Sequence, residues 1–318
     1  MNRTFAAFLA VLGVLALGAL LYWILHNRSG SGSEPTVIPG SENDQHVDSN
    51  RIKKQSDTTE NDKFTKQYEY SDKLHEVIKY HIVSGGSSDL AYVTGYIGND
   101  PSTNIPHVPL IGHSYFITNL PQVYEMAIEN GWSACLVKID GQMKDDNARS
   151  AASKHLKVFP QKYIQSITSR NDYRFVTWFD NKFNVNAKGT RATIDSWRPH
   201  HALMLHQHPF LCGSNNIYCG ADEELEASLN QPRYAMEADR YRIYMKEEAE
   251  KGYPSHGERH FQTGYLLYNM AHEDCSTIQN MWSSHIQRCG IQCQISMYYV
   301  AQRFPRSIGE YVESIEED

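Results

Sequence analysis

The chain has 318 residues, and its 37 acidic and 30 basic side chains give a formal net charge of −7. An acidic balance without a basic stripe interleaved with aromatic residues excludes the usual classes of nucleic-acid-binding protein. A domain of about 240 residues is also large enough to bury a substantial core without disulfides or metals.

The amino-terminal segment is the first predicted element. Residues 5–25 read FAAFLAVLGVLALGALLYWIL and contain no charge. A helix of this length, at about 1.5 Å per residue, crosses a hydrocarbon core of about 30 Å. A cleaved signal peptide is the alternative, but it has a shorter apolar core followed by small residues, where this chain has Leu21–Leu25. We therefore expect a cytosolic tail at 1–4 and a transmembrane signal anchor at 5–25.

The next segment is polar. Residues 29–63 contain only four apolar side chains, too few to offset the entropy of ordering the chain. We predict a disordered stem over 26–73 and a single domain over 74–318, since no second linker or internal repeat follows.

Cysteine usage bears on the compartment. All six cysteines follow residue 130, and an even number of thiols in a large domain suits an oxidising compartment. We expect a bridge between Cys212 and Cys219, and a second from Cys275 to Cys289 or Cys293. This pattern favours a lumenal domain on a membrane protein whose amino terminus is cytosolic.

Strands alternate with helices through the first half of the domain. This alternation predicts a mostly parallel sheet with helices on both faces. The expected strands are 77–83, 91–97, 114–118, 134–139 and 173–179, and the expected helices are 123–130 and 147–159. The second half is more helical, at 222–229, 236–251 and 277–289, and we expect Glu247, Glu248, Glu250 and Lys251 to face solvent.

Asp180 is the first candidate functional residue. It ends the apolar strand 173–179 and precedes the polar turn Asn181-Lys182. Ligands of open α/β sheets bind beyond the carboxyl ends of strands, and a carboxylate there suits a divalent cation that holds a diphosphate. The alternative is a turn-forming Asp-Asn pair.

Three further groups of residues are candidates. His206 and His208 share one face of an extended strand and suit either a metal site or a partly buried strand. Glu224 lies in an acidic helix that faces either a cleft or solvent. Gly264, after Thr263, allows close backbone approach to a ligand or forms a tight turn.

The ordered set of motifs resembles the glycosyltransferase-like family of plant mucilage and turgor-regulation proteins. The resemblance covers most of residues 77–304. It is carried by SYFITN at 114–119, GW at 131–132, KHLKVFPQKYI at 154–164, WFDNKFNV at 178–185, QHP at 207–209, IYCGADEELEASLNQPRY at 217–234, YMKEEAEKGYP at 244–254, TG at 263–264 and QCQISMYYV at 292–300.

The resemblance implies a GT-A-like nucleotide-sugar fold in a type II Golgi membrane protein. Asp180 then matches the family's strand-end aspartate, with Mn²⁺ or Mg²⁺ as its cation, and Glu224 matches a helix glutamate. His208 matches the family's His-Pro motif and Gln294 a late glutamine. Donor binding would also involve Lys182 and the Thr263-Gly264 pair.

The sequence departs from the family pattern at three positions. Cys293 precedes Gln294 where the family has an aspartate, Tyr268 replaces an arginine, and Lys182 stands where an Asp-x-Asp motif has its second carboxylate. The leading hypothesis is a hexosyltransferase-like enzyme that moves sugar from a nucleotide sugar to a glycan or glycoconjugate. The alternatives are a ceramidase-like lipid amidase and a catalytically inactive sugar- or nucleotide-binding module.

Overall fold

A computed structural model describes residues 75–311, except for 86, 140–145, 171, 197–199, 208–218 and 258. The predicted anchor at 5–25, the predicted stem at 26–73, His208 and Cys212 lie outside the described residues. Among the helices within the described ranges, none has the length and apolar character needed to cross a bilayer.

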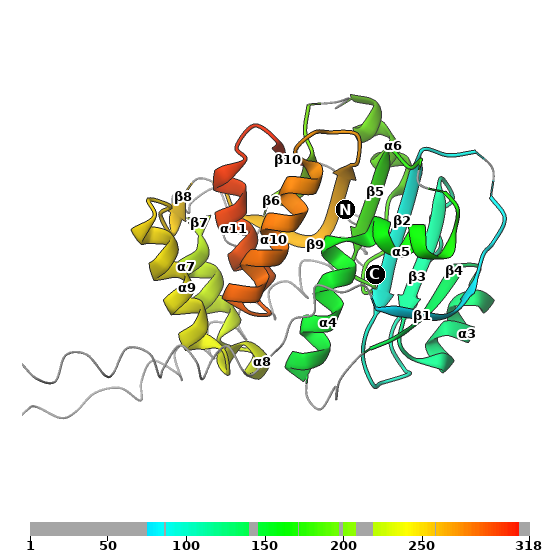
Figure 1. Ribbon diagram of the computed structural model, residues 1–318, viewed down its shortest axis with the longest axis horizontal. Helices are drawn as coiled ribbons and strands as arrows, with labels where there is room; N and C mark the ends of the chain where they lie inside the picture. The colour runs from blue at the N-terminus through cyan, green and yellow to red at the C-terminus, as the bar shows by residue number, and fades with distance from the viewer. Residues whose placement is uncertain are drawn as a thin grey trace, which may run out of the picture. The chain divides into compact units, whose positions relative to one another are not determined.

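An eight-stranded sheet forms the centre of the domain, in the order β1-β4-β3-β2-β5-β9-β6-β10 (Figure 1). Six strands run in one direction, while β1 and β9 run antiparallel to their neighbours. The predicted mostly parallel α/β architecture is confirmed. The strands are β1 Glu76–His81, β2 Leu90–Tyr96, β3 His113–Thr118, β4 Ser133–Lys138, β5 Phe175–Phe179, β6 Leu203–Gln207, β9 Phe261–Asn269 and β10 Ile308–Glu310, with β7 Cys219–Gly220 and β8 His256–Gly257 forming a separate ribbon.

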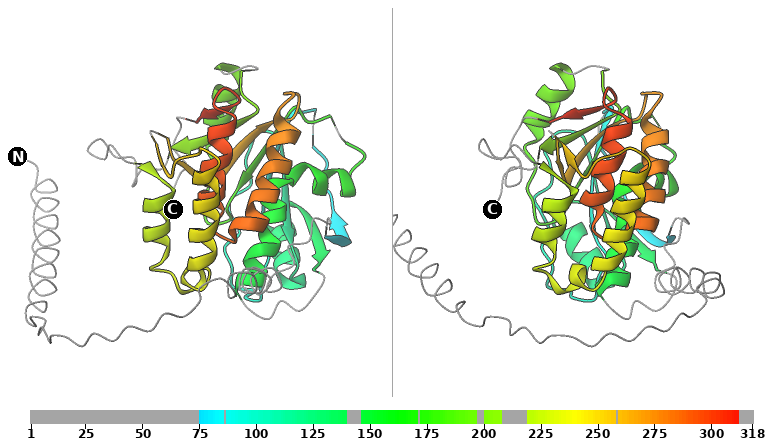
Figure 2. Two further views of the ribbon diagram at one scale, coloured as in Figure 1. Left: turned by 60° about the vertical axis from the view of Figure 1, so that its left-hand side comes forward. Right: turned by 90° about the vertical axis from the view of Figure 1, so that its left-hand side faces the viewer.

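Helices cover both faces of this sheet, as the two views of Figure 2 show. One face packs Leu156, Tyr163 and Trp282 against the strands, and the other packs Tyr124 and Ile194. The helices are α3 Pro121–Glu129, α4 Asp146–Val158, α5 Pro160–Ile167, α6 Ala187–Ser196, α7 Ala221–Ser228, α8 Pro232–Ala235, α9 Ala238–Glu250, α10 Cys275–Cys289 and α11 Cys293–Arg303. Burial on both faces explains why the strands read as continuous apolar runs rather than alternating ones.

Strand β9 was not anticipated from the sequence, which gave Gln262–Tyr265 as either a tight turn or a point of ligand approach. These residues instead pair with β5 on one side and β6 on the other. Gly264 is required there because a Cβ atom would lie 2.7 Å from the ring of Phe183. The tight-turn interpretation is therefore wrong, and the glycine allows close packing within a central strand.

The predicted bridge from Cys275 to Cys289 or Cys293 is also wrong, because all three cysteines are free and buried. Cys275 begins α10 and Cys289 ends it. One helix of that length separates the two Cα atoms by about 21 Å at 1.5 Å per residue, far beyond the roughly 4–7 Å that a disulfide spans. Cys293 begins the next helix, and its sulfur contacts Thr263 instead.

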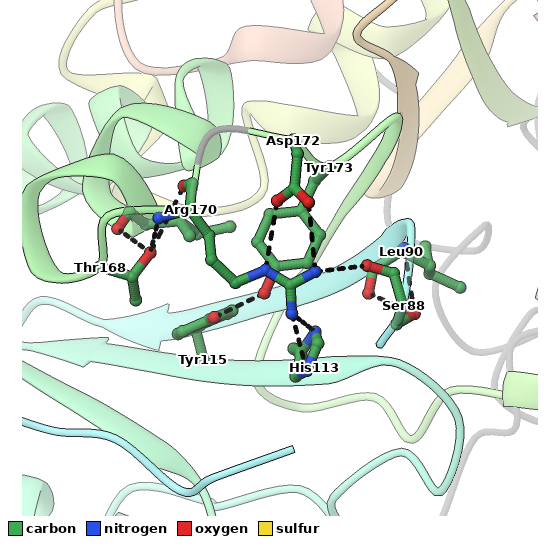
Figure 3. Close-up of polar contacts among 9 residues, drawn as sticks. Ser88, Leu90, His113, Tyr115, Thr168, Arg170, Asp172 and Tyr173 are labelled. Atoms are coloured by element: carbon green, nitrogen blue, oxygen red, sulfur yellow. Dashed lines mark hydrogen bonds and ion pairs between the residues drawn. The ribbon is translucent and has the colours of Figure 1, made fainter. Parts of the chain in front are cut away.

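The amino ends of β2, β3 and β5 are joined by one guanidinium group (Figure 3). Arg170 donates to the carbonyl oxygen of Ser88 at 3.1 Å and to Asp172 at 3.2 Å, and it stacks 4.9 Å from the ring centre of Tyr173. It also contacts His113 at 3.3 Å. These contacts fix one end of the sheet, and the carboxyl ends of the same strands lie at the other.

The environment of Glu248 also differs from the one expected from the sequence. The carboxylate was expected to face solvent, but it is 0% exposed and forms ion pairs with Arg288, Arg303 and Lys251. Burial alone would raise the pKa of Glu248, but the hydrogen bonds from Lys251 and Arg303 outweigh it and lower the pKa to about 2. Periodicity could not identify this residue, since two of its three partners, Arg288 and Arg303, come from α10 and α11, far along the chain.

Replacing Glu248 with glutamine tests this network. The change leaves the largely buried guanidinium group of Arg303 without its counter-charge, whereas Arg288 keeps its ion pair with Glu247. We therefore expect urea denaturation to show a loss of about 3–5 kcal/mol in the free energy of unfolding. The contribution of a carboxylate with a lowered pKa is complete above about pH 4.5 and is lost as the pH falls towards 2. The difference in the free energy of unfolding between wild type and Glu248→Gln should therefore shrink as the pH falls from about 4.5 to about 2. The exposed Glu250→Gln is the control, and equal stability of the two variants would contradict the account.

Candidate functional site

A pocket of about 790 Å³ opens at the carboxyl ends of β2 and β5. Strand β2 continues along the chain to β3 on one side, whereas β5 lies on its other side. The sheet order therefore reverses between these two strands. Ligands of open α/β sheets bind in the crevice that such a reversal creates. The residues after both strands, including Gly98, Asn99 and Asp180, line the pocket.

Asp180 is fixed by contacts from three elements. Its backbone nitrogen donates to the carbonyl oxygen of Gly264 at 2.8 Å, and the indole of Trp178 donates to its Oδ1 at 3.2 Å. The ammonium group of Lys157 lies 2.9 Å from the same oxygen. Its side chain is 34% exposed, so the carboxylate reaches the pocket while its position is set by the sheet.

Helix α4 presents one polar face to the pocket. Ser150, Ser153, Lys154 and Lys157 recur at spacings of three and four residues, which places them on one side of a helix. The two lysines are only 8% and 6% exposed. The hydroxyl of Tyr268 on β9 donates to the carbonyl oxygen of Lys157 at 3.0 Å and holds this turn of the helix in place.

Lys154 differs from Lys157 in its ion pairing. Within the described ranges, no residue forms a hydrogen bond or an ion pair with its ammonium group. Burial lowers the pKa of Lys154, and the charge of Lys157 acts in the same direction, while Cys293 and Asp180 act against it. Burial alone would lower the pKa of Lys157 too, but the carboxylate of Asp180 outweighs it and the pKa is raised.

The amino end of α11 forms another wall. Its N-cap, Gln292, accepts a hydrogen bond from the backbone nitrogen of Gln294 at 3.4 Å. Cys293 follows the N-cap, and its sulfur lies 3.3 Å from the hydroxyl of Thr263. Burial alone would raise the pKa of the Cys293 thiol, but the charges of Lys154 and Lys157 outweigh it and the pKa is lowered. The helix terminus adds a partial positive charge to a pocket that already contains the two ammonium groups of α4.

Glu224 of α7 lies beside the amino end of α11 and is held on both oxygens. Gln292 donates to Oε1 at 2.6 Å, and Ser228 donates to the same oxygen at 3.2 Å. The ring nitrogen Nε2 of His260 lies 3.0 Å from Oε2. These contacts fix the carboxylate at the pocket wall, where it is almost fully buried.

The structure brings most of the sequence-predicted site residues into one pocket. Lining residues include Asp180, Lys182, Glu224, Thr263 and Gln294. Gly264 lies directly behind Asp180, and His208 lies outside the described residues. The sequence analysis missed the two lysines of α4. The available signal was a pair of lysines spaced by three residues at the end of a predicted amphipathic helix, among Leu156, Val158 and Phe159.

The side chains around Asp180 do not fit the predicted divalent cation. Mg²⁺ and Mn²⁺ prefer several oxygen ligands, but Oδ1 of Asp180 already contacts an ammonium and an indole N–H. The neighbouring Lys182 brings a positive charge rather than an oxygen ligand, and Glu224 is bound by its own partners. In the described part of the chain, no cluster of three or more His, Cys, Asp or Glu side chains has a geometry suited to a metal ion.

His206 does not support a metal site either. Its ring packs 4.6 Å from the ring of Tyr311 and 5.6 Å from that of Tyr265. Burial lowers the pKa of His206 to about 4, so the imidazole is neutral at physiological pH. The residue belongs to the core on β6, in agreement with the partly buried strand that was the alternative.

Comparisons with known proteins show weak structural similarity. No protein-family model and no curated protein matches the sequence. Mouse xyloside xylosyltransferase 1 aligns at 9% identity and a TM-score of 0.41, over 70% of this chain and 84% of that one. CMP:2-keto-3-deoxy-manno-octonic acid synthetase complexed with CTP aligns at 12% identity and a TM-score of 0.36, over 72% of this chain and 91% of that one. The bifunctional glycosyltransferase WbbM aligns at 11% identity and a TM-score of 0.36, over 72% of this chain and 40% of that one. With TM-scores below 0.5, these similarities establish neither a family nor an activity for this chain.

Because Lys154 forms no ion pair with a described residue, we expect Lys154→Met to change the stability of the protein. Methionine has a similar shape and removes a buried charge, so we expect the unliganded protein to gain about 0.5–2 kcal/mol. Lys157→Met should instead lose stability, because it leaves Asp180 without its partner. Thermal and urea denaturation of the ligand-free protein measure both. A destabilised Lys154→Met would show that the ammonium has a structural partner and is not reserved for a ligand.

Proposed function

We propose that this protein transfers a sugar from a nucleotide-sugar donor to a glycan or glycoconjugate acceptor. The observation that carries the proposal is the buried ammonium group of Lys154, which lines the pocket and forms no ion pair with any residue that the structure describes. A buried charge is costly unless an opposite charge accompanies it. A ligand that brings negative charge into the pocket supplies that partner, and a diphosphate does so.

The charges around the pocket support an anionic ligand. The described lining residues include two acidic side chains, Asp180 and Glu224, and five basic ones: Arg149, Lys154, Lys157, Lys182 and Arg233. The volume lies in the range of about 300–1,000 Å³ that is typical of small-molecule sites. The resemblance of the ordered motifs to the glycosyltransferase-like family supports the same class of ligand.

The geometry suggests a role for each wall of the pocket. In the transfer step, the bond from the anomeric carbon to the β-phosphate oxygen breaks, and a bond to the acceptor oxygen forms. The ammonium groups of α4 offset the charge that develops on the leaving diphosphate. Glu224 accepts the proton of the acceptor hydroxyl, and His260 and Gln292 position its carboxylate.

A donor-binding protein without turnover is the second candidate. It is favoured by the contacts of Glu224, because both oxygens already take part in hydrogen bonds. A base must release one of these contacts before it can take a proton from an acceptor. Donor binding without turnover would identify this second function.

The full-length protein should be incubated with a panel of nucleotide sugars and candidate acceptors, and released nucleotide should be measured. We expect Glu224→Gln to reduce transfer by about 10²–10⁴-fold, the usual contribution of a general base, with nucleotide affinity nearly unchanged. Glu226→Gln, an exposed residue of the same helix, is the matched control. Undiminished transfer by Glu224→Gln would exclude its role as base. If no nucleotide binds to the wild-type protein, the proposed function is wrong.

We further propose that the domain lies in the lumen of the Golgi, anchored by residues 5–25 of the chain. The 21-residue run without charge supports this arrangement. In sealed microsomes, added protease should leave the chain after residue 26 intact until detergent is supplied. Digestion of the domain before detergent is added would show that it faces the cytosol.

A further inference from the structure

We propose that Lys154 and Lys157, together with the amino end of α11, bind the donor diphosphate in place of a divalent cation. Donor binding then requires no metal. This inference rests on the proposed function, and it identifies the groups that carry the positive charge of the site.

The two ammonium groups of α4 differ in their ion pairing. Lys157 is held 2.9 Å from Asp180, so its charge is shared with a carboxylate. Lys154 lies one helical turn away on the same face and has no such partner among the described residues. The pair thus presents one anchored and one uncompensated positive charge at the pocket wall.

The positive charge of the two ammonium groups equals the charge of one divalent cation. Two ammonium groups supply the two positive charges that a divalent cation would otherwise bring to the diphosphate. The first turn of α11 adds the partial charge of a helix terminus, at Cys293 and Gln294. Charges in a buried site interact more strongly than charges in water, because the surroundings screen them less.

If the two lysines bind the diphosphate, Asp180 is a positioning residue. Its carboxylate fixes the ammonium of Lys157 and is itself fixed by Trp178 and the backbone of Gly264. An aspartate that holds a metal is essential for diphosphate affinity. An aspartate that only orients a lysine adds a negative charge to the site, and its removal favours an anion.

The experiment measures binding of uridine diphosphate and of inorganic pyrophosphate to the full-length protein by calorimetry, with EDTA or with Mn²⁺. We expect the dissociation constants measured with EDTA and with Mn²⁺ to agree within about threefold. Lys154→Met should weaken binding of both ligands by at least tenfold, the loss expected for a buried charge-assisted contact. Lys188→Met, an exposed lysine of α6, is the matched control and should bind as wild type.

Asp180→Asn separates the two roles of the aspartate. If Asp180 positions a lysine, the variant should bind pyrophosphate in EDTA as tightly as wild type or more tightly. If Asp180 holds a cation, the variant should lose most of its affinity in Mn²⁺. Loss of Mn²⁺-dependent binding in Asp180→Asn would therefore overturn the inference, even where Lys154→Met also binds weakly.

The outcomes also distinguish this inference from the function on which it rests. Nucleotide binding that appears only with Mn²⁺ or Mg²⁺ overturns the lysine-based site and leaves the transferase proposal intact. Wild-type affinity in Lys154→Met overturns it as well. If neither uridine diphosphate nor any other nucleotide of the panel binds, with or without metal, the proposed function itself fails.

Discussion

The ion pair between Lys157 and Asp180 joins the last turn of α4 to the end of β5, and the pocket depends on it. Without it, one wall would carry two adjacent buried ammonium groups and the other an isolated carboxylate. With it, Lys154 is the buried ammonium group of this wall that forms no ion pair with a described residue. The tightly packed β9 supports this pair from behind, since Gly264 allows Phe183 and Asp180 to approach the strand.

The two ends of the sheet are built on opposite principles. At the amino ends of β2, β3 and β5, Arg170 has a partner for each side of its guanidinium group, so that end is closed and satisfied (Figure 3). At the carboxyl ends, basic side chains outnumber acidic ones among the described lining residues, and the buried ammonium group of Lys154 forms no ion pair with any of them. Proteins commonly accept a local loss of stability where a ligand supplies the missing interaction.

The sequence predicted the part of the fold that local patterns encode. The strands leading to β5 and the helix containing Lys154 were placed within a few residues, because their apolar periodicity is strong. Strand β9 was missed, since its polar start at Gln262-Thr263 and its glycine resemble a turn when pairing partners are unknown. The burial of Glu248 depends on contacts with α10 and α11, which no local pattern reports. Cys275 and Cys289 lie at the two ends of one helix, which was itself predicted at 277–289, so the predicted helix already argued against a bridge between them.

The site was predicted from single residues, and its chemistry was predicted less well than its place. Asp180 and Glu224 do line one pocket, but their partners, Lys157 and His260, come from other elements. A structure of the protein with bound uridine diphosphate, solved in the presence of EDTA, tests the central claim most directly. We expect a phosphate oxygen within about 3.2 Å of the Lys154 ammonium. A diphosphate bound away from α4, or one that binds only through a metal ion on Asp180, would contradict it.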